Sequence, residues 1–129
     1  MNIDTSIKLQ QSIKSGNLEA VINIYNQYFA TNHECNSVVN AYIFKYAWES
    51  SKYHIANWIN KHAIITNEVL EATYNSLCEK GNQDMLEKFL NTFPYININN
   101  NNAQAYRLAL YNNQEHIIYY MDYYLSSSK

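Results

Sequence analysis

Two glycine–asparagine pairs stand in almost identical surroundings in this 129-residue chain, and they limit its fold more than any other feature. Gly16 lies in "SGNLEAVINIYNQY" and Gly81 in "KGNQDMLEKFLNTF". A glycine readily adopts the positive φ that ends a helix, and an asparagine directly after it can cap the next helix. Each pair therefore predicts a tight turn between two helices.

The same flanking pattern recurs around two small polar residues, Ser51 and Asn112. With the glycines they give turn positions 16, 51, 81 and 112, which are separated by 35, 30 and 31 residues. A period of this length is typical of stacked repeat arrays. The pattern therefore predicts a series of similar units.

Apolar residues recur at fixed distances from the four turn positions. The seventh place before the turn holds Leu9, Phe44, Tyr74 and Ala105. The eighth place after the turn holds Ile24, Ile59, Phe89 and Tyr120. Further apolar columns lie three and four places before the turn and five places after it, a spacing that gathers these side chains on one face of each helix. Each unit is therefore predicted to contain two amphipathic helices whose apolar faces meet.

These patterns predict an all-α fold, a solenoid of about four helix-turn-helix repeats with short irregular loops, in a single domain over residues 1–129. No run of strict alternation is long enough to form a sheet. The repeats should cover roughly residues 3–33, 36–64, 66–95 and 97–126. Helices are expected at residues 5–15, 18–30, 37–49, 52–62, 67–80, 83–92, 102–111 and 114–126. The predicted caps at helix starts are Asp4, Asn36, Thr66 and Asn82. Pro94 should end the sixth helix because it has no backbone N–H.

The charge balance argues against a nucleic-acid-binding protein. Nine basic and 11 acidic residues give a formal net charge of −2, whereas proteins that grip phosphate backbones usually carry a clustered basic surplus. The sequence has no run of about 20 apolar residues that could cross a bilayer. Its start, "MNIDTSIKLQQ", lacks the basic and apolar regions of an export signal. We therefore expect an intracellular protein without membrane association, whose Cys35 and Cys78 stay reduced.

The residues that could carry chemistry do not form a known catalytic pattern. The sequence has no HExxH, no glycine-rich phosphate loop and no Ser or Cys elbow. His54 and His116 stand near turns, where packing or surface roles are more common than catalysis. His33 and Cys35 could form half of a metal site, but no second half is evident. Cys78 lies in an apolar column and is expected to be inert. We predict a protein that is not an enzyme and that uses no metal or cofactor.

Asparagine, isoleucine and tyrosine are abundant. We attribute this bias to an AT-rich genome rather than to a chemical role of these residues. On this interpretation "NINNNNAQ" at 97–104 is a solvated turn that was lengthened by drift. A prion-like segment is the alternative.

The order of elements in each unit resembles ankyrin repeats: a short extended loop, a helix, a G–N turn, then an acidic residue and two aliphatic residues. "ININNNNAQAYRLALYNNQEHIIYYM" at 96–121 is similar to the divergent ankyrin units of giant DNA viruses of amoebae. The likeness covers residues 65–125 well and the first half weakly. The usual T-P-L-H opening is absent from all four units and two turn glycines are missing, so other helical-hairpin solenoids stay open as an alternative.

The resemblance implies protein–protein recognition through the first helices and loops, in the cytoplasm of a host cell or, for a viral protein, in the virion. Carried over to the residues before each turn, the candidate partner-binding residues are Lys14, Glu49, Glu79, Lys80, Leu110 and Tyr111. For the charged residues of this set, the equal alternative to partner binding is that they are solvated side chains at a helix end. Tyr111 is the strongest candidate, because an exposed aromatic side chain is a common interface anchor.

The last predicted helix, in "EHIIYYMDYYLSSSK", is apolar on more than one face. With Ile117, Tyr120, Met121 and Tyr124 directed inward, the remaining residues form an outward patch of Ile118, Tyr119, Tyr123 and Leu125. Only Asp122 interrupts this patch. An outward apolar patch usually marks an interface, so the patch predicts self-association, most simply as a twofold homodimer. A tyrosine-rich helix whose hydroxyl groups reach water is the alternative.

A different class of function stays open as well. The chain could be a structural or nucleic-acid-associated component of a virus or mobile element, with another helical-hairpin fold. Its tyrosines could stack on single-stranded bases, but that mode of binding also needs a basic groove.

Overall fold

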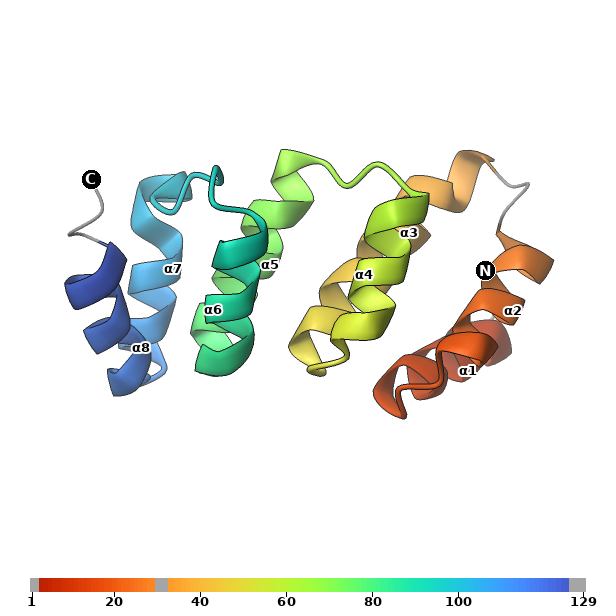
Figure 1. Cartoon of the computed structure of the whole chain (residues 1–129), viewed down its shortest axis with the longest axis horizontal. Coiled ribbons are helices and arrows are strands. Elements are labelled where there is room, and N and C mark those ends of the chain that lie inside the picture. Colours follow the sequence, from red (N-terminus) through yellow and green to blue (C-terminus); the bar gives the residue numbers. More distant parts are fainter. Residues whose placement is uncertain (1–2, 30–32, 126–129) are drawn as a thin grey trace. The chain divides into compact units, whose positions relative to one another are not determined.

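The computed structural model describes residues 3–29 and 33–125, apart from the side chains of residues 33–35, 124 and 125. Throughout these residues the regular structure is helical and contains no strand (Figure 1). The all-α prediction is therefore confirmed. The chain divides into two compact units, Met1–Ile65 and Thr66–Lys129, and the division falls at the predicted junction between the second and third repeats. The single domain stays a prediction.

The first unit consists of two helical hairpins. The first hairpin is formed by α1 (Ile3–Lys14) and α2 (Leu18–Tyr28), and the second by α3 (His33–Glu49) and α4 (Tyr53–His62). Helix α3 packs beside α1 and α4 packs beside α2, so the second hairpin lies alongside the first. Buried apolar side chains from all four helices form the core, among them Leu9, Ile13, Val21, Ile43, Phe44, Trp48, Ile55 and Ile59.

The second unit repeats this construction. Its first hairpin is formed by α5 (Asn67–Lys80) and α6 (Gln83–Thr92), and its second by α7 (Asn100–Tyr111) and α8 (Glu115–Tyr120). A π-helical segment, η1 (Met121–Leu125), continues α8 where one uninterrupted helix was predicted. Helix α7 packs beside α5. The core of this unit includes Leu70, Tyr74, Leu77, Cys78, Leu86, Phe89, Ala105, Ala109 and Ile117.

Side-chain caps begin three of the helices as their sequences predict. The side-chain oxygen of Asn17 accepts a hydrogen bond from the Ala20 N–H at 3.1 Å. Equivalent caps begin α6, at Asn82, and α5, at Thr66. At the other end of α6, the helix stops at Thr92, two residues before Pro94. The caps at Thr66 and Asn82 and the stop before Pro94 are thus confirmed.

Two predicted caps are wrong. Asp4 lies within the first turn of α1, where its charge is favourable beside the helix N-terminus. Helix α3 begins at His33, four residues earlier than predicted, and Asn36 lies inside it. The side chain of Asn36 accepts a hydrogen bond from the Tyr25 hydroxyl at 2.7 Å. This bond joins α2 to the start of α3, so a tertiary contact uses the side chain that was expected to cap the helix.

The asparagine-rich segment is not a simple connecting turn, because part of it belongs to α7. Asn101, Asn102 and Ala103 have φ of 52°, 58° and 57°, so the first part of α7 is a left-handed turn. Arg107 donates hydrogen bonds to the carbonyl oxygens of Asn101 at 2.8 Å and Asn102 at 3.1 Å. Asparagine tolerates this conformation better than most residues do, and the guanidinium group holds the turn closed.

A pair of buried amides anchors this left-handed turn to α5. The side chains of Asn75 and Asn100 donate to each other at 2.9 Å and 3.2 Å, and both residues are buried. Asn100 also donates to the carbonyl oxygen of Asn97 at 2.9 Å. Because a buried amide is costly unless it is hydrogen-bonded, this reciprocal pair specifies where the segment lies. The interpretation of 97–104 as a drifted, solvated turn is therefore wrong for Asn100.

Candidate functional site

All four hairpin turns close with the same two backbone hydrogen bonds. In the first turn, the Gly16 N–H donates to the Ile13 carbonyl at 2.9 Å, and the Asn17 N–H donates to the Ser12 carbonyl at 2.9 Å. This arrangement is the Schellman motif, which needs a residue with positive φ after the helix. The residues that supply it are Gly16 (77°), Ser51 (62°), Gly81 (75°) and Asn113 (56°). The corresponding hydrogen bonds are present in every turn.

The fourth turn is displaced by one residue from its predicted position. Asn113 has the positive φ, whereas Asn112 has a φ of −96°. The buried columns do not all move with it. Ala105, Ala109 and Ile117 are buried at the places predicted by counting from Asn112, whereas at the eighth place the buried residue is Met121, counted from Asn113, instead of half-buried Tyr120. Leu110 accordingly stands three places before the turn, in a column that is buried in the other hairpins.

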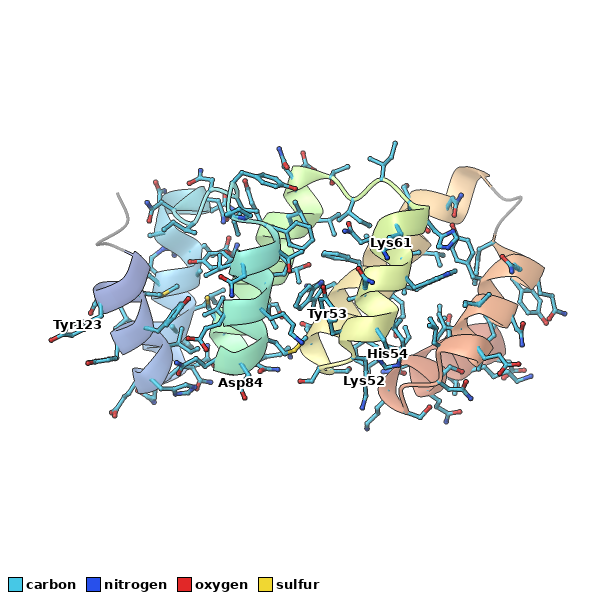
Figure 2. All side chains as sticks on the ribbon, viewed as in Figure 1. Lys52, Tyr53, His54, Lys61, Asp84 and Tyr123 are labelled. Carbon is cyan, nitrogen blue, oxygen red and sulfur yellow. The ribbon has the colours of Figure 1, made fainter. Side chains whose placement is uncertain are left out.

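Within each unit, a histidine ties the second hairpin to the turn of the first. His54 Nε2 lies 2.8 Å from the carbonyl oxygen of Gly16, and His116 Nε2 lies 2.7 Å from that of Gly81. Both histidines stand three residues after the left-handed residue of their own turn. Figure 2 shows His54 and Lys52 at the same end of α4, with Lys61 at the other end. These contacts give the two histidines a structural role and place the turns of neighbouring hairpins side by side.

The predicted partner-binding residues lie at this turn end of the first helices. In the first unit, Lys14 is exposed and Glu49 is partly exposed. In the second unit, Lys80 is exposed and Glu79 is partly exposed. Tyr111 is 88% exposed, which makes it the most accessible of the predicted anchors. Each unit therefore brings the residues of its two turns to one end, while their role in binding stays a prediction.

Leu110 differs from its counterparts in the other hairpins. The third place before the left-handed residue holds Ile13, Trp48 and Cys78, all of which are buried. Leu110 is 49% exposed. In the fourth hairpin the neighbouring residue Ala109 is buried instead, because the left-handed residue lies one place later relative to the apolar column.

The outward side of α8 and η1 carries two exposed tyrosines, Tyr119 and Tyr123. Their rings are stacked, with centroids 4.5 Å apart and planes inclined by 28°, and Tyr123 projects away from the hairpin in Figure 2. We call this pair the tyrosine face. Asp122 is exposed beside it, and its carboxylate lies 3.5 Å from the Tyr106 hydroxyl. Of the other residues predicted for self-association, Ile118 is half-buried, and the side chain of Leu125 lies outside the described residues.

The described titratable groups provide no reactive centre of a familiar type. Cys78 is fully buried, and burial raises the pKa of its thiol to about 12, so the thiol stays protonated near neutral pH. Burial also raises the pKa of the neighbouring Tyr74. No group of three or more potential metal ligands occurs among the residues that the structure describes. The side chains of His33 and Cys35, the predicted half-site, lie outside those residues.

No helix in the described ranges is both long enough and apolar enough to cross a bilayer.

The comparisons with known proteins leave the family of this chain open. The chain matches no protein-family model, and no curated protein or solved structure is significantly similar to it.

Proposed function

We propose that this chain is a non-enzymatic protein–protein interaction module, built as one ankyrin-like stack of four helical hairpins, that self-associates through its C-terminal hairpin. The recurring turn supports the repeat architecture, because the same hydrogen bonds close all four hairpins. The side-by-side packing of hairpins within each unit supports it as well. Such arrays leave extended surfaces for partners, since each repeat buries its core only against its neighbours.

The exposed surface of the fourth hairpin carries the proposal of self-association. Leu110, Tyr119 and Tyr123 are exposed large side chains on a single hairpin, although α7 and α8 pack together. Tyrosine is enriched at protein interfaces because it offers a large apolar ring and a hydroxyl that can stay hydrated. At the tenth place after the turn, where this hairpin has Tyr123, the others have exposed Asn26, Lys61 and Asn91.

Sedimentation velocity over a wide concentration range tests self-association. We expect the wild-type chain to associate with increasing concentration, and we expect Tyr123→Glu to weaken that association about tenfold or more, because it places a charge in a desolvated contact. Tyr95→Glu is the matched control, since Tyr95 is equally exposed but lies between α6 and α7. A wild-type chain that stays monomeric throughout, or equal effects of the two substitutions, would refute the proposal.

Recognition of another protein through the turn ends is tested by comparing captured partners. The tagged chain and its Tyr111→Ala variant are isolated from cells that produce the chain naturally, with Tyr95→Ala as the control. A partner that is lost with Tyr111→Ala and kept with Tyr95→Ala would support the turn-end surface. Identical sets of captured proteins from all three chains would contradict it.

A further inference from the structure

The first helices of the first unit expose an apolar cluster outside the buried columns. Ile3 (74% exposed) and Ile7 lie on α1, and Val38 (69% exposed) and Tyr42 lie on α3. We call these four residues the apolar quartet. Ile3 and Val38 are 35 residues apart, as are Ile7 and Tyr42, and this is also the interval between Gly16 and Ser51. The quartet therefore occupies equivalent positions in two neighbouring hairpins.

The packing of the unit places the two halves of the quartet next to each other. Helices α1 and α3 are in contact, and the bond from His54 to Gly16 brings their turn ends together, so the helices run parallel. Equivalent residues of the two helices point into the core, namely Leu9 with Phe44 and Ile13 with Trp48. Because the inward stripes correspond, the outward stripes correspond as well. Ile3 and Val38 thus form one row, and Ile7 and Tyr42 form the next.

Charge follows the quartet along the same two stripes. One turn beyond Ile7 and Tyr42 lie Gln10 and exposed Lys45, and exposed Lys14 follows on α1 beside Glu49 on α3. From the start of the helices toward their turn ends, the face is therefore apolar in two rows and then polar, with two lysines and one glutamate.

The tyrosine face lies in a stripe that has an acidic residue near each end. Glu115, Tyr119 and Tyr123 are four residues apart and all exposed, so they lie in one stripe along α8 and η1, with exposed Asp122 beside Tyr123. Successive members of such a stripe are separated by about one helical turn, or roughly 5–6 Å. The rows of the quartet have the same spacing, since Ile3 and Ile7 are also four residues apart.

We propose that the tyrosine face of one copy docks onto the apolar quartet of a second copy, with α8 running antiparallel to α1 and α3. In this arrangement Tyr123 meets Ile3 and Val38, Tyr119 meets Ile7 and Tyr42, and Glu115 lies opposite Lys45. A helix laid between two parallel helices is an efficient way to bury such a stripe. The pairing of Glu115 with Lys45 favours this direction.

This inference rests on the proposed self-association and names the surface that receives the C-terminal helix. The contact joins two different surfaces, so it differs from the twofold dimer that the sequence suggested. A heterologous contact of this kind leaves one free surface of each type and continues into longer assemblies unless a ring closes.

The second unit shows why the receiving face belongs to the first. The positions on α5 that correspond to Ile3 and Ile7 hold Glu68 and Ala72, which offer no large apolar side chain. The chain itself folds Asn100 against Asn75 on α5, and both amides are buried there. In the first unit no left-handed residue is found among the described residues of α3, and Val38 and Tyr42 on this helix are exposed.

A mixing experiment with the full-length chain tests the proposal. Val38→Glu blocks the quartet, and Tyr123→Glu blocks the tyrosine face. Because both positions are exposed, both variants should keep the fold, which circular dichroism can verify. We expect each variant alone to be monomeric by sedimentation velocity. We expect their mixture to form a 1:1 complex that grows no further, because each supplies the intact surface that the other lacks. Ile64→Glu, at a more exposed apolar residue of the same unit, is the control and should associate like the wild type.

A charge exchange supplies an independent readout. Lys45→Glu and Glu115→Lys should each weaken association about threefold, as expected for a partly exposed ion pair, and the double variant should recover the wild-type affinity.

The results of these experiments distinguish the docking model from self-association in general. If the wild type associates and Tyr123→Glu prevents it while Val38→Glu does not, or if the mixture stays monomeric, the docking model is overturned and self-association stands. A wild-type chain that is monomeric at every concentration overturns both.

Discussion

The two units are built from the same hairpins but present different surfaces on their first helices. Both close their turns with the Schellman motif, and both use a histidine to hold the second hairpin against the turn of the first. The first unit, however, exposes apolar Ile3 and Val38, whereas the second folds an asparagine-rich turn back onto α5. The comparison shows that the repeated sequence pattern determines the hairpin itself. The segment that connects two hairpins determines which side chains the outer face of the first helices exposes.

The largest expected effect tests whether the units act together. Phe89 and Ile59 occupy the same column in the two units, and both are fully buried. Phe89→Ala should lower the free energy of unfolding by about 3–5 kcal/mol, because it leaves a cavity in the core of the second unit. Both tryptophans, Trp48 and Trp58, lie in the first unit, so urea unfolding followed by tryptophan fluorescence reports that unit alone.

In the proposed four-hairpin stack, Phe89→Ala shifts the fluorescence midpoint together with the midpoint from circular dichroism. Ile59→Ala is the control that perturbs the first unit directly. A fluorescence midpoint that Phe89→Ala leaves unchanged would mean that the two units unfold independently, and it would contradict the single stack.

The second prediction concerns the buried amide pair. Asn75→Ala should destabilise the protein by about 1–3 kcal/mol, since it leaves the buried Asn100 amide without its reciprocal partner. Lys45→Ala replaces the corresponding exposed residue of the first unit and should change stability by only about 0.5 kcal/mol. Urea unfolding by circular dichroism measures both values. Equal losses would show that the amide pair contributes nothing specific.

The third prediction compares the two glycine turns. Each glycine has a φ near 76°, at 77° for Gly16 and 75° for Gly81, and an alanine in that conformation costs about 1–2 kcal/mol. Gly81→Ala should cost more than Gly16→Ala, because its new Cβ would collide with the Gln114 side chain, whose amide donates to the Glu79 carbonyl at 3.0 Å. The Cβ of Gly16→Ala would make only an ordinary 3.4 Å contact with Lys52.

The reverse substitution is the control for this prediction. Ser51 has a positive φ of 62° without being a glycine, so Ser51→Gly should stabilise the first unit by about 0.5–1 kcal/mol. Thermal unfolding of the three variants ranks them. If Gly16→Ala proves as costly as Gly81→Ala, the contact with Gln114 is unimportant.

The smallest expected effect depends on pH. Burial raises the pKa of Cys78 from 9.0 to about 12, so the folded state keeps a proton that the unfolded chain releases above pH 9. The stability that this thiol confers is complete below pH 9 and is lost as the pH rises toward 12. The free energy of unfolding should therefore fall by about 1 kcal/mol between pH 8 and pH 10. Cys78→Ala should show a flatter dependence over the same interval, and parallel curves would contradict the assignment.

Much of the hairpin architecture could be predicted because its causes are local. Gly16 and Gly81 end their helices through a backbone conformation that glycine adopts without steric cost. Thr66 and Asn82 cap helices with hydrogen bonds to residues three positions away. The fourth turn was misplaced because "YNNQ" offers two adjacent asparagines, and either can adopt a left-handed conformation.

The surfaces were predicted less completely. Helical periodicity indicated that Tyr119 and Tyr123 would lie outside the apolar stripe, and both are exposed. The apolar quartet was missed, although one signal was present: Val38 and Tyr42 repeat Ile3 and Ile7 at the same 35-residue interval as the first two turns. The bond between Asn36 and Tyr25, by contrast, joins two different helices, and no local pattern indicated it.

By itself, the sequence determined the helices, their turns and the apolar columns that pair them, because these features depend on neighbours within one or two helical turns. Only the tertiary structure decided which of two asparagines makes the fourth turn, that Asn100 is buried against Asn75, and that the quartet is open. The physical reason is that burial of a polar group or exposure of an apolar one depends on residues that are distant in sequence and are brought together only when the hairpins pack.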